Sequence, residues 1–419
     1  MAENTVLVIG GGAAGMMAAG QAAAGGARVF LIEKNDRLGR KLAISGKGRC
    51  NITNDKPISD FCACYPGNGR FLQGILHEFD NVRLRSFLAG YGVETKVERG
   101  GRVFPVAGEA ESVVRALSKF LAAAGVEVKL GQAAEAVIAV GGKVRGVRVA
   151  GGRTYPGKAV IVCTGGATYP ATGSSGDGYR FAQDLGHRVI SPRPALVSLR
   201  TAEGWVSELQ GLSLRNVAVT LKVDGRAQAS DLGEMLFTHF GVSGPLVLTL
   251  SRLAGDALRQ GKRVKLEVNL KPGLNPEQLD RRLQRDFSQA ANKQFKNALN
   301  ALLPQSLIPV IIRLAGIDPD KVVHQVTRNE RRSLAALLQS LPLTVSGTLP
   351  LAAAIVTAGG VDVKTIDPKT MASKSVQGLY WAGEVVDVDG VTGGYNLQAA
   401  FAMGYRAGRA AGRYAQGSV

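Results

Sequence analysis

The sequence predicts an α/β protein in which a Rossmann-type domain is interrupted by a β-rich, barrel-like domain and a small helical domain. The apolar strand Thr5–Ile9 runs into a Gly-x-Gly-x-x-Gly turn that a helix follows. Residues 190–348 then change to alternating apolar and polar segments, and after these to helical ones. A later strand ending in Ala382-Gly383-Glu384 returns the chain to the first domain. Glycines at this spacing between a strand and a helix are typical of a dinucleotide site.

The three glycines of the first turn are expected to have different structural roles. Gly10 allows the tight turn, Gly12 lets the backbone approach a pyrophosphate, and Gly15 lets the helix pack closely on the sheet. We expect the pyrophosphate at the helix N-terminus, where unpaired N–H groups and the helix dipole favour negative charge. Glu33 closes the next strand and is placed to accept hydrogen bonds from a ribose.

Residues 37–54 interleave cations, hydroxyls and small residues. Backbone donors together with Arg or Lys can line the rest of a diphosphate and a ribityl chain. This pattern favours FAD over NAD as the bound cofactor.

The 419 residues are 45% hydrophobic and 20% charged, which is typical of a globular chain with two or three domains. Four cysteines without regular spacing predict no disulfide framework, so we expect a reducing, cytoplasmic compartment. Residues 5–27 carry no charge, but Gly and Ala dominate them and Glu3 precedes them. We therefore expect neither a signal peptide nor a membrane span.

The net charge of +18 is spread along the chain. One interpretation is a basic enzyme with an anionic cofactor, and the other is a nucleic-acid partner. The basic helical stretch Arg281–Lys296 favours the second interpretation, unless it is only a solvated face.

The run Gly39-Arg40-Lys41, continued by Gly46-Lys47-Gly48-Arg49-Cys50-Asn51-Ile52-Thr53-Asn54, resembles the signature of the BaiN/RdsA family of NAD(P)/FAD-dependent oxidoreductases. That family is similar to flavoproteins of the glutathione-reductase type, in which FAD lies extended with its adenine in the Rossmann half. The resemblance implies hydride transfer at flavin N5. It leaves the substrate open, since the family includes ribosomal-RNA dihydrouridine synthases, reductases of conjugated carbon–carbon double bonds and an aminoacetone oxidase.

Three further stretches match the family: the strand end at residues 163–166, the hydroxyl-rich loop 169–179 and the stretch 233–245. The strand that ends in Ala382-Gly383-Glu384 is similar to the second flavin fingerprint of this superfamily, in which the acidic residue bonds the ribityl chain. The helix that opens at 393–400 is suited to hold the pyrimidine edge of the flavin. By analogy, the loop 169–179 approaches the flavin or the substrate. The family's Thr-Met-Glu-Ser-Lys reads Thr370-Met371-Ala372-Ser373-Lys374 here, so any role of that lost carboxylate does not carry over.

The motifs and the resemblance together imply a set of cofactor-binding residues. They are Gly10, Gly12, Ala13, Ala14, Gly15, Glu33, Lys34, Arg40, Lys41, Ser45, Gly46, Gly48, Arg49, Cys50, Asn51, Ala136, Thr164, Gly165, Gly166, Gly383, Glu384, Gly394, Asn396 and Leu397. No metal site is expected.

Three residues are candidates for catalysis: Cys50, Tyr169 and His239. Position 55 is Asp, so Cys50 lacks the Cys-x4-Cys partner of the disulfide reductases. Cys50 either contacts the isoalloxazine, donates a proton or simply lines the site. His239 lies in a glycine-rich stretch that we expect to be a loop.

We expect residues 1–190 and 350–419 to form the FAD domain, 191–275 with 341–349 the β-rich domain, and 276–340 the helical insertion. No second Gly-x-Gly-x-x-Gly follows a strand, so NAD(P)H, the expected reductant, has no domain of its own. Ribosomal RNA or its precursor is one candidate partner, with uridine reduced to dihydrouridine. The alternatives are a small-molecule enzyme, either an enone reductase or an amine oxidase, and a flavin-bearing RNA-binding or sensor protein with little turnover.

Overall fold

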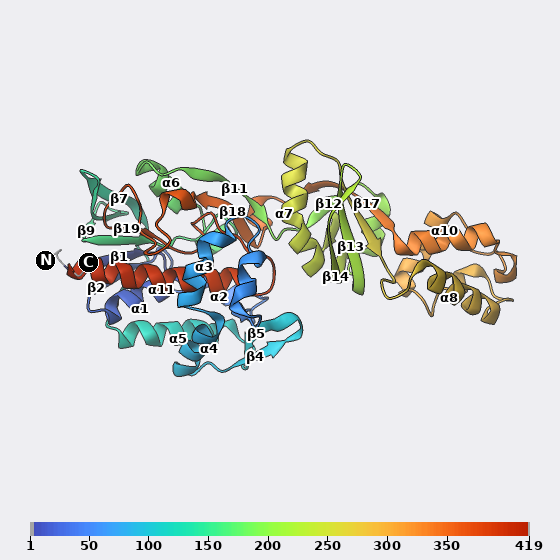
Figure 1. Ribbon diagram of the computed structural model, residues 1–419, viewed down its shortest axis with the longest axis horizontal. Coiled ribbons are helices and arrows are strands. Elements are labelled where there is room, and N and C mark those ends of the chain that lie inside the picture. Colours follow the sequence, from blue (N-terminus) through green and yellow to red (C-terminus); the bar gives the residue numbers. More distant parts are fainter. Residues whose placement is uncertain (1–3, 418–419) are drawn as a thin grey trace. The chain divides into compact units, whose positions relative to one another are not determined.

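A computed structural model describes residues 4–417 (Figure 1). The chain divides into two compact units: Met1–Ala195 with Leu351–Val419 (unit 1), and Leu196–Pro350 (unit 2). The predicted α/β class, with a Rossmann-type sheet and a barrel, is confirmed.

Unit 1 is built on a five-stranded parallel sheet in the order β19-β10-β1-β2-β6. Its strands are β1 (Thr5–Ile9), β2 (Arg28–Ile32), β6 (Glu127–Lys129), β10 (Ala159–Val162) and β19 (Leu379–Trp381). The chain leaves β1 toward β2 on one side and later returns through β10 on the other. The strand order therefore reverses between β1 and β10, where α/β proteins bind ligands beyond the carboxyl ends of the strands.

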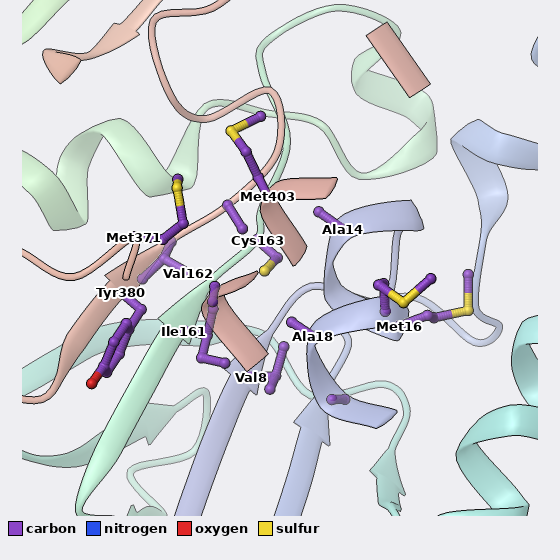
Figure 2. Packing of buried hydrophobic residues seen from close by; sticks show 14 of the residues in the cluster. Val8, Ala14, Met16, Ala18, Ile161, Val162, Cys163, Met371, Tyr380 and Met403 are labelled. Atoms are coloured by element: carbon purple, nitrogen blue, oxygen red, sulfur yellow. The ribbon is translucent and has the colours of Figure 1, made fainter. Parts of the chain in front are cut away.

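Two helices pack closely beside this sheet, α1 (Ala13–Ala24) and α11 (Tyr395–Gln416) (Figure 1). A Cβ atom at Gly404 would lie 2.3 Å from the carbonyl oxygen of Ala14, and one at Gly408 would lie 2.3 Å from that of Ala18. Small residues therefore let the two backbones touch. Figure 2 shows part of this core, with Val8 of β1 beside Ala18.

The remaining helices of unit 1 surround this core, and its remaining strands form three small sheets. The helices are α2 (Arg40–Ile44), α3 (Gly69–Glu78), α4 (Asn81–Gly90), α5 (Ala110–Ala123) and α6 (Asp177–Asp184). The small sheets are β3 (Thr53–Asn54) with β5 (Arg102–Pro105) and β4 (Thr95–Glu98); β7 (Ala134–Val140) with β8 (Lys143–Val149) and β9 (Thr154–Pro156); and β11 (Val189–Ala195) with β18 (Val356–Val361).

Unit 2 contains a closed six-stranded barrel in the order β12-β15-β14-β13-β16-β17. The strands are β12 (Leu199–Thr201), β13 (Ser213–Val223), β14 (Arg226–Thr238), β15 (Gly241–Ser243), β16 (Val264–Asn269) and β17 (Leu341–Thr348). The helices are α7 (Pro245–Arg259), α8 (Pro276–Gln289), α9 (Ile308–Ala315) and α10 (Arg328–Gln339). Barrel and helices share one hydrophobic core. The sequence-based boundary between a β-rich and a helical domain stays a prediction.

Candidate functional site

The glycine-rich turn joins β1 to α1 at the point where the strand order reverses. Gly10 has φ +102°, and a Cβ there would lie 2.5 Å from the carbonyl oxygen of Cys163, just beyond β10. A Cβ at Gly15 would lie 1.8 Å from the carbonyl oxygen of Gly10. Contacts within the protein therefore require glycine at both positions.

Gly12 has a different environment. Its φ of −84° suits any residue, and a Cβ there would meet no atom of the described chain within 4 Å. Gly12 also caps α1 without a side-chain hydrogen bond. The first-turn N–H groups of a helix have no partner inside the helix, so this turn offers donors and free space to an anion.

The carboxylate of Glu33 lies against this turn and is buried. Its Oε2 accepts from the backbone N–H of Gly11 (2.6 Å), and its Oε1 accepts from the backbone and side-chain nitrogens of Asn35 (2.8 and 2.6 Å). An ionised carboxylate has about four acceptor positions, so capacity is left for a ribose hydroxyl. Arg40 in turn donates to Asn35 Oδ1 (2.9 Å).

The ammonium of Lys34 anchors the second half of the loop 169–179. It lies 2.6 Å from Asp177 Oδ2 and 2.5 Å from Ser175 Oγ. The side chain of Asn35 also donates to the carbonyl of Thr172 (3.2 Å). This half of the loop therefore lies beside the end of β2, near Glu33. Its approach to a flavin or substrate stays a prediction.

A second network joins the two fingerprint regions. Lys41 Nζ lies 2.6 Å from Glu384 Oε2 and donates to Thr168 Oγ1 (2.6 Å). Glu384 Oε1 accepts from the backbone N–H of Thr357 (2.8 Å) and from Thr168 Oγ1 (3.2 Å). A Cβ at Gly166 would lie 2.3 Å from Thr357 Oγ1, so the strand end at 164–166 packs against the same network.

At the N-terminus of α11, the backbone of Gly394 lies close to the backbone of Thr53. A Cβ at Gly394 (φ +99°) would lie 2.3 Å from the carbonyl oxygen of Thr53. With the amide of Asn51 oriented to satisfy its neighbours, its oxygen accepts from the N–H of Gly394 (3.0 Å). Asn396 exchanges two hydrogen bonds of 2.8 Å with the backbone of Gly390. The stretch 51–54 thereby fixes the loop that opens α11.

Cys50 is fully buried at the end of the stretch 45–50 and has φ +58°. Burial raises the pKa of its thiol to about 12, against a smaller lowering by a hydrogen bond with Ser45. The thiol is therefore protonated at neutral pH, and a thiolate nucleophile is disfavoured. All four cysteines are free.

The other two catalytic candidates lie in different units. Tyr169 is in unit 1, has φ +51° and is 37% exposed. His239 is in unit 2, where its ring contacts Phe240 edge-on with centroids 4.9 Å apart. His239 lies in the tight turn between β14 and β15, whereas these two strands occupy most of the stretch 233–245 that was expected to be a loop. Pairing within the barrel explains the difference.

Several expected cofactor residues are held by contacts within the chain. Ser45 Oγ donates to the carbonyl of Leu42 (2.7 Å), and the carbonyl of Gly48 accepts from the N–H of Ala110 (2.7 Å). The guanidinium of Arg49 pairs with Glu98 and lies 4.3 Å from the ring centre of Phe104.

The last expected residues lie in β7, in α11 and in connecting segments of unit 1. Ala136 is paired in β7 with Arg148 of β8, and Leu397 is in the first turn of α11. Gly46, Gly165 and Gly383 have positive φ values of +58°, +73° and +85°. Thr164 directly follows Cys163 at the end of β10, and its buried hydroxyl oxygen has no hydrogen-bond partner among the described residues.

Sequence reasoning missed four residues of these networks: Asn35, Thr168, Asp177 and Thr357. Asp177 lies inside the recognised loop 169–179, and Asn35 and Thr168 lie next to recognised residues, yet none of the four belongs to a spacing rule. Within residues 4–417, no group of three or more His, Cys, Asp or Glu side chains could hold a metal ion. No helix in the same range is long and apolar enough to cross a membrane.

Comparison with known proteins agrees with this geometry. The family model of the HI0933-like protein Rossmann domain matches residues 4–410. The chain is 33% identical to the 3-dehydro-bile acid delta(4,6)-reductase of Clostridium scindens over 97% of its length and 99% of the relative. It is 32% identical to the ribosomal RNA dihydrouridine synthase of Haemophilus influenzae, over 95% and 96% of the two chains.

Among solved structures, the chain resembles the 3-ketosteroid delta1-dehydrogenase of Sterolibacterium denitrificans, with a TM-score of 0.55 and 15% identity over 98% and 100% of the two chains. This likeness supports the fold alone. The family match and the full-length relatives confirm the resemblance seen in the sequence. The chain therefore belongs to the HI0933-like family of Rossmann-type, FAD-binding flavoprotein oxidoreductases.

Proposed function

We propose that this protein uses bound FAD to reduce a carbon–carbon double bond conjugated to a carbonyl, with NAD(P)H as the reductant and a uridine of ribosomal RNA as the leading substrate. The observation that carries this proposal is the agreement between two full-length relatives. One is named as a delta(4,6)-reductase and the other as a dihydrouridine synthase. Both names describe the saturation of such a bond.

The glycine-rich turn fits the diphosphate of FAD. The free space at Gly12 is a cradle that a side chain would fill, and α1 points its first-turn N–H groups there. Glu33 has acceptor capacity for the ribose beside this turn. The other cofactor residues expected from the sequence complete the proposed site.

The network of Lys41 and Glu384 would hold the ribityl end of the cofactor. Bound there, FAD supplies the hydride chemistry, and the chain supplies orientation and exclusion of water. The N-terminus of α11 at Gly394 places a positive dipole end near the proposed pyrimidine edge. Positive potential at that edge favours a reduced, anionic flavin.

Reduction of the uracil 5,6-bond needs hydride at one carbon and a proton at the other, so an acid must face the substrate. The high pKa of Cys50 makes it a poor donor at neutral pH. Tyr169 and His239 stay the candidates for this acid. A uridine must also leave its stack to reach the flavin, which favours an unpaired RNA site.

A second candidate function is reduction of a small-molecule enone. The bile acid relative supports it, since its identity to this chain is as high as that of the RNA-modifying relative. Both functions predict that the purified protein is yellow and that heating releases FAD.

The test measures NADH and NADPH oxidation by the holoprotein with a steroid dienone or with ribosomal RNA from a deletion strain. Formation of dihydrouridine in that RNA, with no turnover of the dienone, supports the leading substrate. Turnover of the dienone with unchanged RNA supports the small-molecule function. A folded protein that contains FMN or no flavin would contradict both.

A further inference from the structure

The basic helical stretch Arg281–Lys296, which is either a nucleic-acid contact or a solvated face, is partly paired with carboxylates within the fold. Of its five cations, Arg282 and Arg285 lie 2.7 and 3.6 Å from the carboxylate of Asp286. Lys296 lies 2.7 Å from Asp320. Only Arg281 and Lys293 have no carboxylate within 4 Å among the described residues. Three of the five cations therefore contact a carboxylate, although Arg282 and Arg285 share one, and two cations are unpaired.

A different group of cations gathers at one end of the barrel. We call Lys222, Arg226, Lys262, Arg263 and Lys265 the barrel-end cluster. Lys222 of β13 is directly opposite Lys265 of β16, and Val223 is paired with Arg226 on the other side. The sheet therefore brings three strands of the cluster side by side, with neighbouring strands about 5 Å apart.

The pleat directs part of this cluster outward. Val264 and Leu266 of β16 are buried in the barrel core, so Arg263 and Lys265 face the opposite, outer side. The turn of β13 and β14 is tied to the start of β16, because the N–H of Asp224 donates to the carbonyl of Arg263 (2.9 Å). The cluster is thus held in place by backbone pairing.

Four of these five cations are unpaired. Within the described chain, no carboxylate lies within 4 Å of the charged groups of Arg226, Lys262, Arg263 and Lys265, and all four are exposed. Lys222 pairs with Glu267 at 2.6 Å. The nearby Asp224 carboxylate accepts from the backbone N–H of Arg263 (3.0 Å). The cluster therefore keeps a clear excess of positive charge.

We propose that the barrel-end cluster is the surface on which the phosphate backbone of the RNA substrate docks, in place of the helical stretch Arg281–Lys296. This inference rests on the proposed function with RNA as substrate. Exposed cations without partners suit phosphates, which position an RNA without reading its bases. Residues 222–228 and 260–265 expose no large apolar side chain, which argues against insertion into a membrane.

Two triple variants of equal charge change test the surface. Lys262→Gln with Arg263→Gln and Lys265→Gln removes three charges from the cluster. Arg281→Gln with Lys293→Gln and Arg328→Gln removes three exposed charges from the helical part of unit 2. Binding of the holoprotein to deproteinised ribosomal RNA and to oligouridylate is measured across a salt series. NADPH oxidation is measured in parallel as a check that the flavin site is intact.

The cluster variant should bind RNA at least tenfold more weakly at low salt, with the slope of log affinity against log salt reduced by about 2 to 3. The helical variant should keep both values close to wild type. Equal losses in the two variants, or a greater loss in the helical one, would contradict the barrel-end cluster as the docking surface but would leave the proposal of RNA as the substrate intact.

If the wild-type protein binds no RNA at low salt, RNA is not the substrate, although flavin reduction by NADPH would still stand. Cluster-dependent binding to vesicles with anionic lipid, with RNA binding unchanged, would assign the cluster to a membrane and also overturn it.

Discussion

Lys41 Nζ lies 2.6 Å from Glu384 Oε2, although 343 residues separate the two positions along the chain. The two side chains are 26% and 20% exposed, and Thr168 bonds to both. This ion pair joins the segment after β2 to the segment after β19. It therefore fixes the two halves of the proposed cofactor site relative to each other within unit 1.

Replacing Glu384 by Gln should destabilise the apoprotein by about 1–3 kcal/mol, between the values for exposed and buried ion pairs. The reason is that Lys41 would keep its charge in a partly buried place without a counter-ion. Urea unfolding measures the change. Glu127→Gln is the control, since the pair of Arg28 and Glu127 is 55% and 39% exposed, and solvent screening should make its loss less costly than that of Glu384. Equal effects of the two variants would contradict the role of the pair.

Gly12→Ala should lower the affinity for FAD, whereas Gly15→Ala should lower the stability of the protein. A Cβ at position 12 meets no atom of the described chain, so the apoprotein should keep its stability within about 1 kcal/mol. Its FAD affinity should fall at least tenfold, because the methyl group fills the cradle. A Cβ at position 15 lies 1.8 Å from the carbonyl oxygen of Gly10, so Gly15→Ala should cost about 3 kcal/mol or more.

Flavin titration and urea unfolding of the two variants separate these effects. Gly12→Val extends the test, since a larger side chain should abolish binding while the apoprotein still folds. If Gly12→Ala retains normal FAD affinity, the diphosphate does not lie at this turn.

The Rossmann-type unit was predictable because its signals are local. Thr5–Ile9 is β1 as predicted, and Gly10 and Gly15 have the environments that their spacing implies. Residues 155–162 are divided between β9 and β10, which belong to different sheets. Gly157 and Lys158 separate them, a change of partner that no periodicity reveals.

The networks of the site were less predictable because they join distant segments. Glu33 was expected to face a ribose, but its contacts to Gly11 and Asn35 depend on how two turns meet in space. The basic helical stretch was visible in the sequence, whereas the pairing of Lys296 with Asp320 was not. Side chains that pair over long distances in the chain follow no fixed spacing in the sequence. The sequence alone therefore overestimated the number of unpaired cations in that stretch.

The contact between α1 and α11 predicts a strong effect of one methyl group. Gly408→Ala would place a Cβ 2.3 Å from the backbone oxygen of Ala18, so it should destabilise the protein by about 2–3 kcal/mol. Gly74→Ala in α3 is the matched control, because its Cβ would lie 3.6 Å from an Arg406 nitrogen, which is an ordinary van der Waals contact. It should be neutral or stabilise by up to about 1 kcal/mol. Thermal unfolding that ranks the two variants in the reverse order would contradict this packing.

Cys50 should not be an obligatory redox thiol. Its pKa of about 12 keeps it protonated, and Asp55 stands where a partner cysteine would be needed. Cys50→Ser should leave flavin reduction by NADPH within about threefold of wild type, since a protonated thiol without a partner cysteine is not expected to carry electrons. Stopped-flow bleaching of the flavin absorbance measures the rate, and thiol alkylation of the native protein at pH 8 should spare Cys50. Complete loss of reduction with FAD still bound would show that the thiol takes part in the reaction.

The last prediction concerns the buried His187 of unit 1. Its Nε2 lies 2.8 Å from Ser373 Oγ, and its ring packs edge-on against Trp381 with centroids 5.2 Å apart. Burial lowers the pKa of His187, against a smaller opposing effect of the Leu185 backbone. Because the unfolded chain binds the proton more tightly, the contribution of His187 is complete above its unfolded pKa of about 6.5 and is lost as the pH falls through the folded value.

The free energy of unfolding should therefore decrease between pH 7.5 and pH 5, and this decrease should be smaller in His187→Gln, whose amide does not titrate. Other groups also contribute to the pH dependence, so the difference between variant and wild type is the quantity to measure, by urea unfolding at closely spaced pH values. His77→Gln is the control, because it replaces a histidine that is exposed on α3 by the same residue type. A profile of His187→Gln that runs parallel to wild type over this range would mean that the protonation of His187 is not linked to folding.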